Sequence, residues 1–221
     1  MRIVVVGTGT EIGKTHVTAC LLRCARSQGR RVLGYKPVAT GVDDRCDDAE
    51  EHARAAASPY LPPTFTYRRP VSPHLAAREE ERPIDLDVIR RRADELARDH
   101  DVVVVESAGG LFSPLSDTRT NVDLVQRLLP ALVILVAPDR LGVLHDVGAC
   151  TRAARASGIA VAALVLSTPR QPDGATASNA RELERVSLGP VAGVFPHAAV
   201  DDAASQRAAA RVWACLSGEP G

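Results

Sequence analysis

Two lysines stand out as candidate functional residues, because every other strongly basic side chain is an arginine. Lys14 and Lys36 are the only lysines among the 27 Lys and Arg residues of this 221-residue chain. Arg is a planar, permanently charged fork, whereas Lys is a compact ammonium on a flexible stem whose pKa its surroundings can shift. The two are interchangeable on a surface but not in a binding site, so both lysines are expected to serve a site.

Lys14 lies in a segment with the composition of a phosphate-binding loop. The sequence GTGTEIGKT, residues 7–15, follows a short apolar run and leads directly into a predicted helix. In such a loop, backbone N–H groups and the helix N-terminus face a polyphosphate, the lysine contacts its terminal oxygens, and the threonine hydroxyl coordinates Mg²⁺. Thr8 stands where the strict pattern G-x-x-x-x-G-K-[ST] has its first glycine. The strand before and the helix after nevertheless favour phosphate binding over a glycine-rich turn without a ligand.

Glu106 is a candidate for the metal ligand that such a loop requires. It ends the apolar run VVVVE, and the SAGG segment that follows allows a ligand to approach the backbone closely. In open α/β sheets ligands bind at the carboxyl ends of the strands, and Mg²⁺ prefers hard oxygen ligands. The alternative is an acid that only caps the next turn. The acidic residues of segment 43–48 could supply another ligand, although such clusters are more often solvated loops.

Alternating strand and helix patterns surround these residues. Apolar runs without polar alternation are typical of parallel strands covered on both faces. They occur at residues 3–6, 102–105, 132–137 and 160–166, with weaker candidates at 31–35 and 190–195. Helical patterns lie between them, at 14–28, 47–57, 85–99, 121–129, 143–157, 176–186 and 201–216. This order predicts a doubly wound α/β fold, with a mostly parallel sheet and helices on both faces.

A proline-rich segment interrupts the alternation. Residues 58–84 contain six prolines, and we expect an irregular insertion there rather than a linker between domains. A chain of 221 residues with 45% hydrophobic content is long enough to bury one large core. We therefore predict a single domain over residues 1–221.

Charge, cysteine content and hydropathy narrow the functional class. The 27 acidic residues balance the 27 basic ones, so no net field attracts nucleic acid or an anionic membrane, and small-molecule substrates are expected. The five cysteines form no CxxC pair and have no histidine cluster beside them, so we interpret them as reduced and buried rather than metal-binding. The N-terminus lacks the pattern of a secretory signal and no apolar run reaches about 20 residues, which predicts a cytoplasmic protein.

Six motifs together resemble those of the dethiobiotin synthetase family. They are GTGTEIGKT at 7–15, GYKPVATG at 34–41, CDDAEEHA at 46–53, SPHLAA at 72–77, VVVESAGGLFSPLSDT at 103–118 and RLG at 140–142. A weaker similarity is GVFPH at 193–197. The phosphate loop alone is shared with many ATPases, whereas its combination with GYKPVATG and the E-x-A-G-G segment is far more specific.

The resemblance implies an ATP- and Mg²⁺-dependent ligase that closes a ureido ring. In this family CO₂ converts one amine of 7,8-diaminononanoate to a carbamate, ATP phosphorylates the carbamate, and the second amine attacks the mixed anhydride, with release of ADP and phosphate. No covalent enzyme nucleophile is needed, so catalysis depends on positioning and on neutralising charge. The family works as a homodimer, and the resemblance implies the same here.

The resemblance also implies roles for individual residues. It places Lys36 at the carbamate oxygens and Lys14 at the γ-phosphate, as the catalytic pair. The implied Mg²⁺ ligands are Thr15, Asp48 and Glu106, with Asp47 as an alternative to Asp48. The implied nucleotide-binding residues are Thr10, Glu11, Ile12, Gly13, Lys14, Thr15, His16, Glu106, Ser167, Pro196 and His197, although His16 fits an ordinary helix residue equally well. The implied substrate-binding residues are Lys36, Thr40, Gly142, Leu144 and His145.

Two segments depart from the family pattern. Where the family usually has Asn-His, contributed by the partner subunit near the substrate carboxylate, this chain has His145 and Asp146. The added negative charge would weaken binding or select another substrate tail, unless Asp146 faces away as an N-terminal helix residue. Where many members have Asn-Asp at the adenine, this chain has Ser167 and Thr168. Because Ser167 offers fewer donors and acceptors than asparagine, we expect CTP or GTP to support measurable turnover.

Two other functions are alternatives. One is a related synthetase for another carboxylate or carbamate, such as the cobyrinic acid amidating enzymes, which carry a glutaminase domain that this chain has no room for. The other is a nucleotide-driven switch of the partitioning or membrane-placement class. Such switches often have an extra lysine early in the loop, where this chain has Thr8, and a basic amphipathic tail. Residues 205–216 contain only two arginines, which disfavours a switch.

Overall fold

Six parallel strands form the central sheet of the computed structural model, which describes residues 1–218. The strands are β1 (Arg2–Gly7), β2 (Val32–Tyr35), β5 (Val102–Glu106), β6 (Leu132–Pro138), β7 (Val161–Ser167) and β8 (Val191–Phe195). Their order across the sheet is β2-β5-β1-β6-β7-β8, and every neighbouring pair is parallel. The prediction of a doubly wound parallel sheet is confirmed, with all six strands at their predicted positions.

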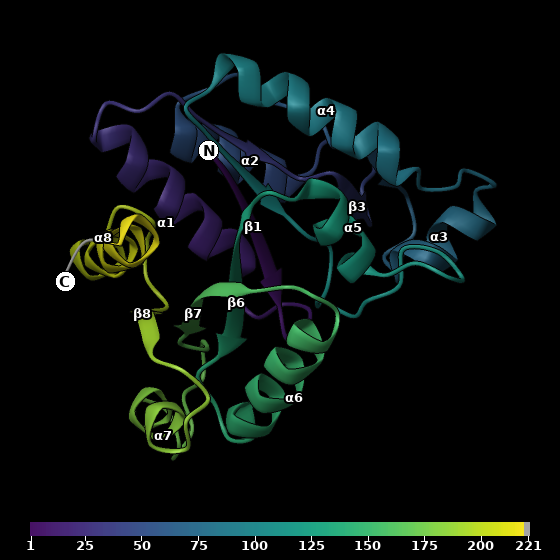
Figure 1. The fold of residues 1–221 in the computed structure, drawn as a ribbon. Coiled ribbons are helices and arrows are strands. Elements are labelled where there is room, and N and C mark those ends of the chain that lie inside the picture. Colours follow the sequence, from purple (N-terminus) through teal and green to yellow (C-terminus); the bar gives the residue numbers. More distant parts are fainter. Residues whose placement is uncertain (219–221) are drawn as a thin grey trace.

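Eight helices connect and cover the strands of the described chain. They are α1 (Lys14–Ser27), α2 (Asp47–Ala56), α3 (Pro73–Glu79), α4 (Leu86–Asp99), α5 (Asn121–Leu128), α6 (Val143–Ala156), α7 (Asn179–Arg185) and α8 (Ala203–Ser217). Helices α1, α2 and α8 pack on one face of the sheet, while α4, α5 and α6 cover the other (Figure 1). Right-handed crossovers between parallel strands require such a two-sided arrangement.

The two faces of the sheet belong to two separate hydrophobic cores. Ile3 and Val5 of β1 pack with α1 and α8, whereas Val4 and Val6 pack with α4, α5 and α6. Successive side chains of a strand point to opposite faces, so a strand that is covered on both faces must be apolar throughout. Each fully buried Val or Ile contributes about 1.5–3 kcal/mol relative to an exposed one. The apolar runs of the sequence follow from this requirement.

The prediction of an irregular segment at 58–84 is wrong in part. This segment contains β4 (Phe65–Tyr67), which pairs in parallel with β3 (Val38–Thr40), and it also contains α3. Pro73 opens α3 at a position where a helix needs no backbone N–H, so this proline starts the helix instead of breaking it. The three-residue strands are too short to show a periodicity.

The described residues bear on two further points. Cys20, Cys24, Cys46 and Cys150 are buried, but Cys215 is exposed on α8, so the prediction of five buried cysteines is wrong for this one. Among the helices of residues 1–218, none is both long enough and apolar enough to cross a membrane.

Candidate active site

A cavity of about 930 Å³ opens at the carboxyl edge of the sheet. The phosphate loop contributes Thr10 and Glu11 to its lining, and the segment after β2 contributes Lys36 and Thr40. The acidic segment 43–48 and the turn 108–109 that follows β5 close it from other sides. Because all strands are parallel, their carboxyl ends meet at this one edge, which brings segments distant in sequence together.

The phosphate loop presents an uncapped helix N-terminus at this edge. Gly13 stands at the N-cap of α1 with φ of 90°, a conformation that favours glycine, and it has no side chain to cap the helix. At α4, by contrast, the carboxylate of Asp85 accepts hydrogen bonds from the first backbone N–H groups. The corresponding N–H groups of α1 are therefore left for an anion.

Lys14 begins α1 and is folded back over the loop. Its Nζ donates to the carbonyl oxygen of Gly9 at 2.9 Å, and only 6% of the residue is exposed. Burial, followed by the neighbouring charge of Lys36, lowers the pKa of Lys14 to about 8. The ammonium thus lies where the phosphate loop turns and is poised to gain from a nearby anion.

Lys36 forms a buried ionic cluster with two carboxylates. Its Nζ lies 2.7 Å from Glu106 Oε1 and 2.7 Å from Asp48 Oδ2, and the Lys36 and Glu106 residues are 5% and 1% exposed. Burial alone would lower the pKa of Lys36, but the two carboxylates outweigh it and raise that pKa. Burial likewise acts to raise the pKa of Glu106, and the charge of Lys36 with a hydrogen bond from His52 keeps it low instead. Both groups are therefore ionised.

Three oxygen atoms converge beside this cluster. Thr15 Oγ1 lies 2.7 Å from Asp48 Oδ1 and 3.0 Å from Glu106 Oε1. A hydroxyl has one proton, so it donates to only one carboxylate at a time, and the oxygens together suit a small hard cation. Within residues 1–218, no group of three or more His, Cys, Asp and Glu side chains could hold a metal ion. The set of two carboxylates and a hydroxyl nevertheless fits Mg²⁺, which keeps several waters when bound.

The structure distinguishes the two neighbouring aspartates. Asp48 points to Lys36 and Thr15, whereas Asp47 is exposed at the rim of the same cavity. Residues adjacent on a helix point about 100° apart, so only one of them can face Lys36. Asp48 is therefore the better candidate for a metal ligand.

Two residues that support the site were not predicted from the sequence. His52 of α2 is 1% exposed, and its Nε2 lies 2.7 Å from Glu106 Oε2. Asn121, fully buried at the start of α5, donates to the carbonyl oxygens of Ala108 and Gly110 at 2.7 and 2.8 Å, which fixes the turn after Glu106. The helical i, i+4 spacing of Asp48 and His52 is the signal that could have revealed the histidine, because it places both on one face.

Several of the predicted nucleotide-binding residues gather around the start of α1. A Cβ added to Gly13 would overlap the Ser167 hydroxyl, so Ser167 lies directly against the phosphate loop. The rings of His16 and Phe195 meet edge to face, with centroids 6.3 Å apart, and Pro196 and His197 follow at the end of β8. Burial, and then the charge of His197, lower the pKa of His16. The phosphate loop and the carboxyl ends of β7 and β8 thus lie together at the start of α1.

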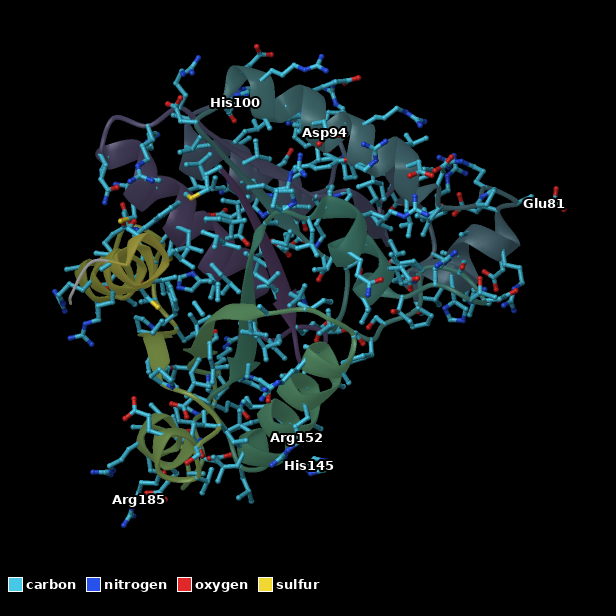
Figure 2. The ribbon with its side chains drawn as sticks, in the orientation of Figure 1. Glu81, Asp94, His100, His145, Arg152 and Arg185 are labelled. Carbon is cyan, nitrogen blue, oxygen red and sulfur yellow. The ribbon has the colours of Figure 1, made fainter. Side chains whose placement is uncertain are left out.

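The remaining substrate-binding candidates lie elsewhere on the single chain. Gly142, Leu144 and His145 belong to the start of α6, and His145 projects from the surface of that helix (Figure 2). His145 and Asp146 line a different cavity of about 520 Å³, which borders the phosphate loop at residues 7–9. One chain therefore does not bring them to Lys36 and Thr40. Asp146 Oδ2 accepts a hydrogen bond from Arg140 Nη2 at 3.2 Å, which offsets the added negative charge.

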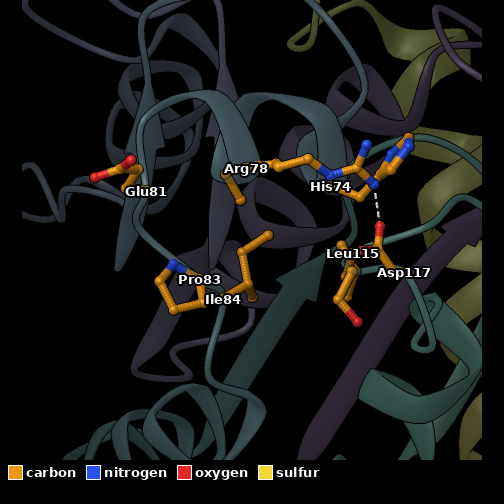
Figure 3. A pocket seen from close by; sticks show the side chains of 9 residues that line it. His74, Arg78, Glu81, Pro83, Ile84, Leu115 and Asp117 are labelled. Atoms are coloured by element: carbon orange, nitrogen blue, oxygen red, sulfur yellow. Dashed lines mark hydrogen bonds and ion pairs between the residues drawn. The ribbon is translucent and has the colours of Figure 1, made fainter.

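A third cavity lacks the predicted site residues. It measures about 290 Å³ and lies between α3 and the loop at 115–117, where Arg78 and Asp117 form an ion pair (Figure 3). Ile84 and Leu115 give it an apolar lining. None of the residues implied for nucleotide, metal or substrate binding contributes to it, so the candidate site is the cavity of about 930 Å³ that is lined by Lys36 and Thr40.

Comparisons with known proteins show which family this chain belongs to. A family model described as AAA domain matches residues 1–204. The chain is 37% identical over 215 residues to the ATP-dependent dethiobiotin synthetase BioD of Streptomyces coelicolor, covering 96% of this chain and 90% of that protein. It is 35% identical over 209 residues to BioD 1 of Escherichia coli K12, covering 88% and 90%.

Solved structures show a similar fold at much lower identity. The MinC:MinD cell division protein complex of Aquifex aeolicus aligns with a TM-score of 0.61 at 14% identity, over 100% of this chain and 97% of that one. The cell division ATPase MinD of Pyrococcus furiosus aligns with a TM-score of 0.59 at 17% identity, over 98% of both chains. At these identities the likeness concerns the fold alone.

Proposed function

This chain belongs to the ATP-dependent dethiobiotin synthetase family, and from this premise we propose which of its residues carry out ring closure. The structural observation that best supports the residue roles is the ionic cluster at the phosphate loop. There the Lys36 ammonium lies 2.7 Å from a carboxylate oxygen of Asp48 and 2.7 Å from one of Glu106, and Thr15 is hydrogen-bonded to Asp48. A charged lysine held at the floor of a cavity suits an anionic intermediate such as a carbamate. The identity to the synthetases, over most of the chain, disfavours a nucleotide-driven switch.

The reaction proposed for this site has three steps. One amine of 7,8-diaminononanoate adds to CO₂, loses a proton and becomes a carbamate. A carbamate oxygen then accepts the γ-phosphoryl group of ATP, with ADP as leaving group. The second amine attacks the carbonyl carbon and loses a proton, the bond from that carbon to the phosphate oxygen breaks, and the five-membered ureido ring closes as phosphate leaves.

Lys36 is proposed to bind the carbamate oxygens. Of its three N–H donors, two point to Glu106 and Asp48, while the third has only a long contact of 3.4 Å to the carbonyl oxygen of Ser107. A contact of this length is weak, so the third donor is the one available to an anion in the cavity. Because the two carboxylates raise the pKa of Lys36, its charge persists at neutral pH.

Lys14 and the start of α1 are proposed to hold the phosphates. The Lys14 ammonium needs only to exchange the carbonyl oxygen of Gly9 for a phosphate oxygen. Thr15, Asp48 and Glu106 would hold Mg²⁺, which would neutralise charge on the terminal phosphates. Ser167, Pro196 and His197 would surround the base. Because no side chain needs to form a covalent bond, these residues act by orientation and by charge.

A homodimer is proposed to complete the substrate site. Thr40 lines the same cavity as Lys36, whereas His145 lines a separate one. Gly142, Leu144 and His145 of a second copy could meet the carboxylate end of a substrate whose amines lie at Lys36. Two-fold dimers are the commonest symmetric assemblies, and one such interface would complete both sites at once.

Phosphate release from ATP tests the assignment directly. We expect release to require both 7,8-diaminononanoate and bicarbonate, and to fall to background when either is left out. Release that ignores the diamine would contradict the synthetase assignment and favour a switch. The same assay with CTP or GTP tests the expectation for Ser167, since a strict requirement for ATP would contradict relaxed base recognition.

A further inference from the structure

His52 is a buried histidine whose hydrogen-bond partner, within residues 1–218, is the candidate metal ligand Glu106. It lies on α2, four residues after Asp48, and its imidazole reaches the centre of the site. The Nε2 atom lies 2.7 Å from Glu106 Oε2, so it must donate a hydrogen to the carboxylate, while Nδ1 has no hydrogen-bond partner among residues 1–218. Within residues 1–218, the hydrogen bond to Glu106 is therefore the one polar contact of the imidazole ring.

The two oxygens of Glu106 are held from opposite sides. Oε2 accepts from His52, whereas Oε1 lies 2.7 Å from Lys36 Nζ and 3.0 Å from Thr15 Oγ1. A carboxylate rotates about its last bond unless both oxygens are held, and a buried oxygen without a donor is unfavourable. The contact with His52 thus determines which oxygen faces Thr15.

The backbone is built to let His52 approach. A Cβ added to Gly34 of β2 would lie 2.5 Å from His52 Cβ and 2.8 Å from its Cγ. Real Cβ atoms essentially never come so close, so any larger residue at position 34 would displace α2 or the imidazole. Gly34 begins the GYKPVATG segment that also carries Lys36, so one segment provides both the lysine and the space for the histidine.

We infer that His52 is a positioning residue of the synthetase site, which orients Glu106 so that Oε1 faces the Thr15 hydroxyl where a divalent cation would be held. It acts through Glu106 and touches neither the substrate nor the phosphates. The inference rests on the proposed function for the identity of the site. A residue that only fills the core would support stability without affecting the cation, and this difference makes the inference testable.

The test compares His52→Leu with His52→Gln. Leucine fills similar space without a donor, whereas the glutamine amide places a donor N–H near the position of Nε2. The probe is Mn²⁺ in the presence of ADP, with free Mn²⁺ measured by electron paramagnetic resonance. We expect His52→Leu to bind Mn²⁺ about tenfold more weakly and His52→Gln to recover most of this loss, because substitutions behind a metal ligand typically reduce affinity 10- to 100-fold. ADP affinity in EDTA should change less than about twofold, because His52 does not contact the phosphate loop.

Two further variants separate positioning from folding. Ala55→Gly loosens the same helix one turn away without touching Glu106, and it should leave Mn²⁺ affinity unchanged. Gly34→Ala keeps the imidazole but displaces it, and it should weaken Mn²⁺ binding as His52→Leu does. It also provides the test if His52→Leu does not fold.

Specific outcomes would overturn the inference. Normal Mn²⁺ affinity in His52→Leu or in a folded Gly34→Ala would show that the histidine only fills space. Equal losses in His52→Leu and His52→Gln would show that the donor is unimportant. If the unsubstituted protein instead binds Mn²⁺ with ADP but releases no phosphate with the diamine, the proposed function fails, while the Mn²⁺ comparison still decides the role of His52.

Discussion

The ionic cluster around Glu106 and the ion pairs on the surface of α4 use the same charges in opposite settings. In the cluster, Lys36 and Glu106 are almost fully buried and pair with each other. Lys36 also pairs with Asp48, and Glu106 also contacts His52. On α4, Arg92 and Glu95 pair at 3.1 Å with about half of each side chain in water. Exposed pairs contribute about 0–1 kcal/mol, whereas removing one member of a buried pair costs about 3–5 kcal/mol. Similar distances therefore carry very different consequences.

The choice of basic residue follows the same division. Both lysines are buried, and within residues 1–218 no arginine is buried to that extent. On the surface, the larger guanidinium forms pairs that need no particular geometry from the protein. In the site, a compact ammonium fits between two carboxylates, and its pKa responds to its surroundings. Both lysines of this arginine-rich chain thus lie at the candidate site.

Removing the charge of Lys36 is expected to have the largest effect on stability. In Lys36→Met the buried Glu106 would lose its cationic partner, and we expect the free energy of unfolding to fall by about 3–5 kcal/mol. Urea denaturation measures this change. Lys14→Met is the matched control, because Lys14 is equally buried but donates only to a backbone carbonyl, and its loss should be below about 1.5 kcal/mol. Equal losses in the two variants would break the contrast between paired and unpaired lysines.

Replacing Lys36 by arginine keeps the charge and changes only the shape. The longer planar group cannot occupy the same space between Glu106 and Asp48, so we expect kcat to fall at least about 100-fold while the protein still folds. Diamine-dependent phosphate release measures kcat. Arg92→Lys, the reverse change on the surface, should leave activity unchanged. Near-normal turnover in Lys36→Arg would mean that the site needs a positive charge but not a lysine.

More of the fold than of the site could be predicted from the sequence. Apolar runs located the four central strands, β5, β1, β6 and β7, because burial on both faces leaves no polar alternation to confuse the pattern, whereas the edge strands β2 and β8 gave weaker signals. The segment 58–84 was misjudged because its prolines indicate irregular structure, while Pro73 in fact begins a helix. Its strand β4 exists only by pairing with β3, a tertiary contact that no local pattern encodes.

Within the site, the sequence identified the groups but not their relations. Glu106 was predictable because it ends a strand, and Lys36 because it is one of two lysines and lies in the GYKPVATG motif. The choice between Asp47 and Asp48 depends on the rotation of α2, which is set by packing. His52 was missed because its function depends on a partner 54 residues away. Sequence spacing shows which face of α2 it shares, but not what that face meets.

Breaking a surface pair should have a far smaller effect. In Arg92→Ala, Glu95 stays hydrated, so we expect the free energy of unfolding to change by less than about 0.5 kcal/mol and activity to stay the same. Urea denaturation beside Lys36→Met gives a direct comparison. A loss above about 2 kcal/mol would show that exposure does not separate the two kinds of pair.

Salt should affect only the exposed charges. Asp101 is exposed, and hydrogen bonds from the Arg31 side chain and backbone lower its pKa to about 2. Because the pKa is lower in the folded protein, the ionised carboxylate stabilises the fold fully at pH values above its ordinary pKa of 3.8. This contribution is lost as the pH falls through about 2. The ion pair is open to solvent, and the Debye length shortens from about 10 Å at 0.1 M salt to about 3 Å at 1 M.

We therefore expect the Asp101 carboxyl carbon, followed by NMR, to begin titrating at a higher pH in 1 M NaCl than in 0.1 M. The shift should be small, under about one pH unit, because the hydrogen bonds from Arg31 persist when the Coulomb attraction is screened. Glu106 should remain ionised over the same range at both salt concentrations, since its partners are buried with it. If Asp101 ignored salt while Glu106 responded, burial would not be what separates the two regions, and the special role of the two lysines would need another cause.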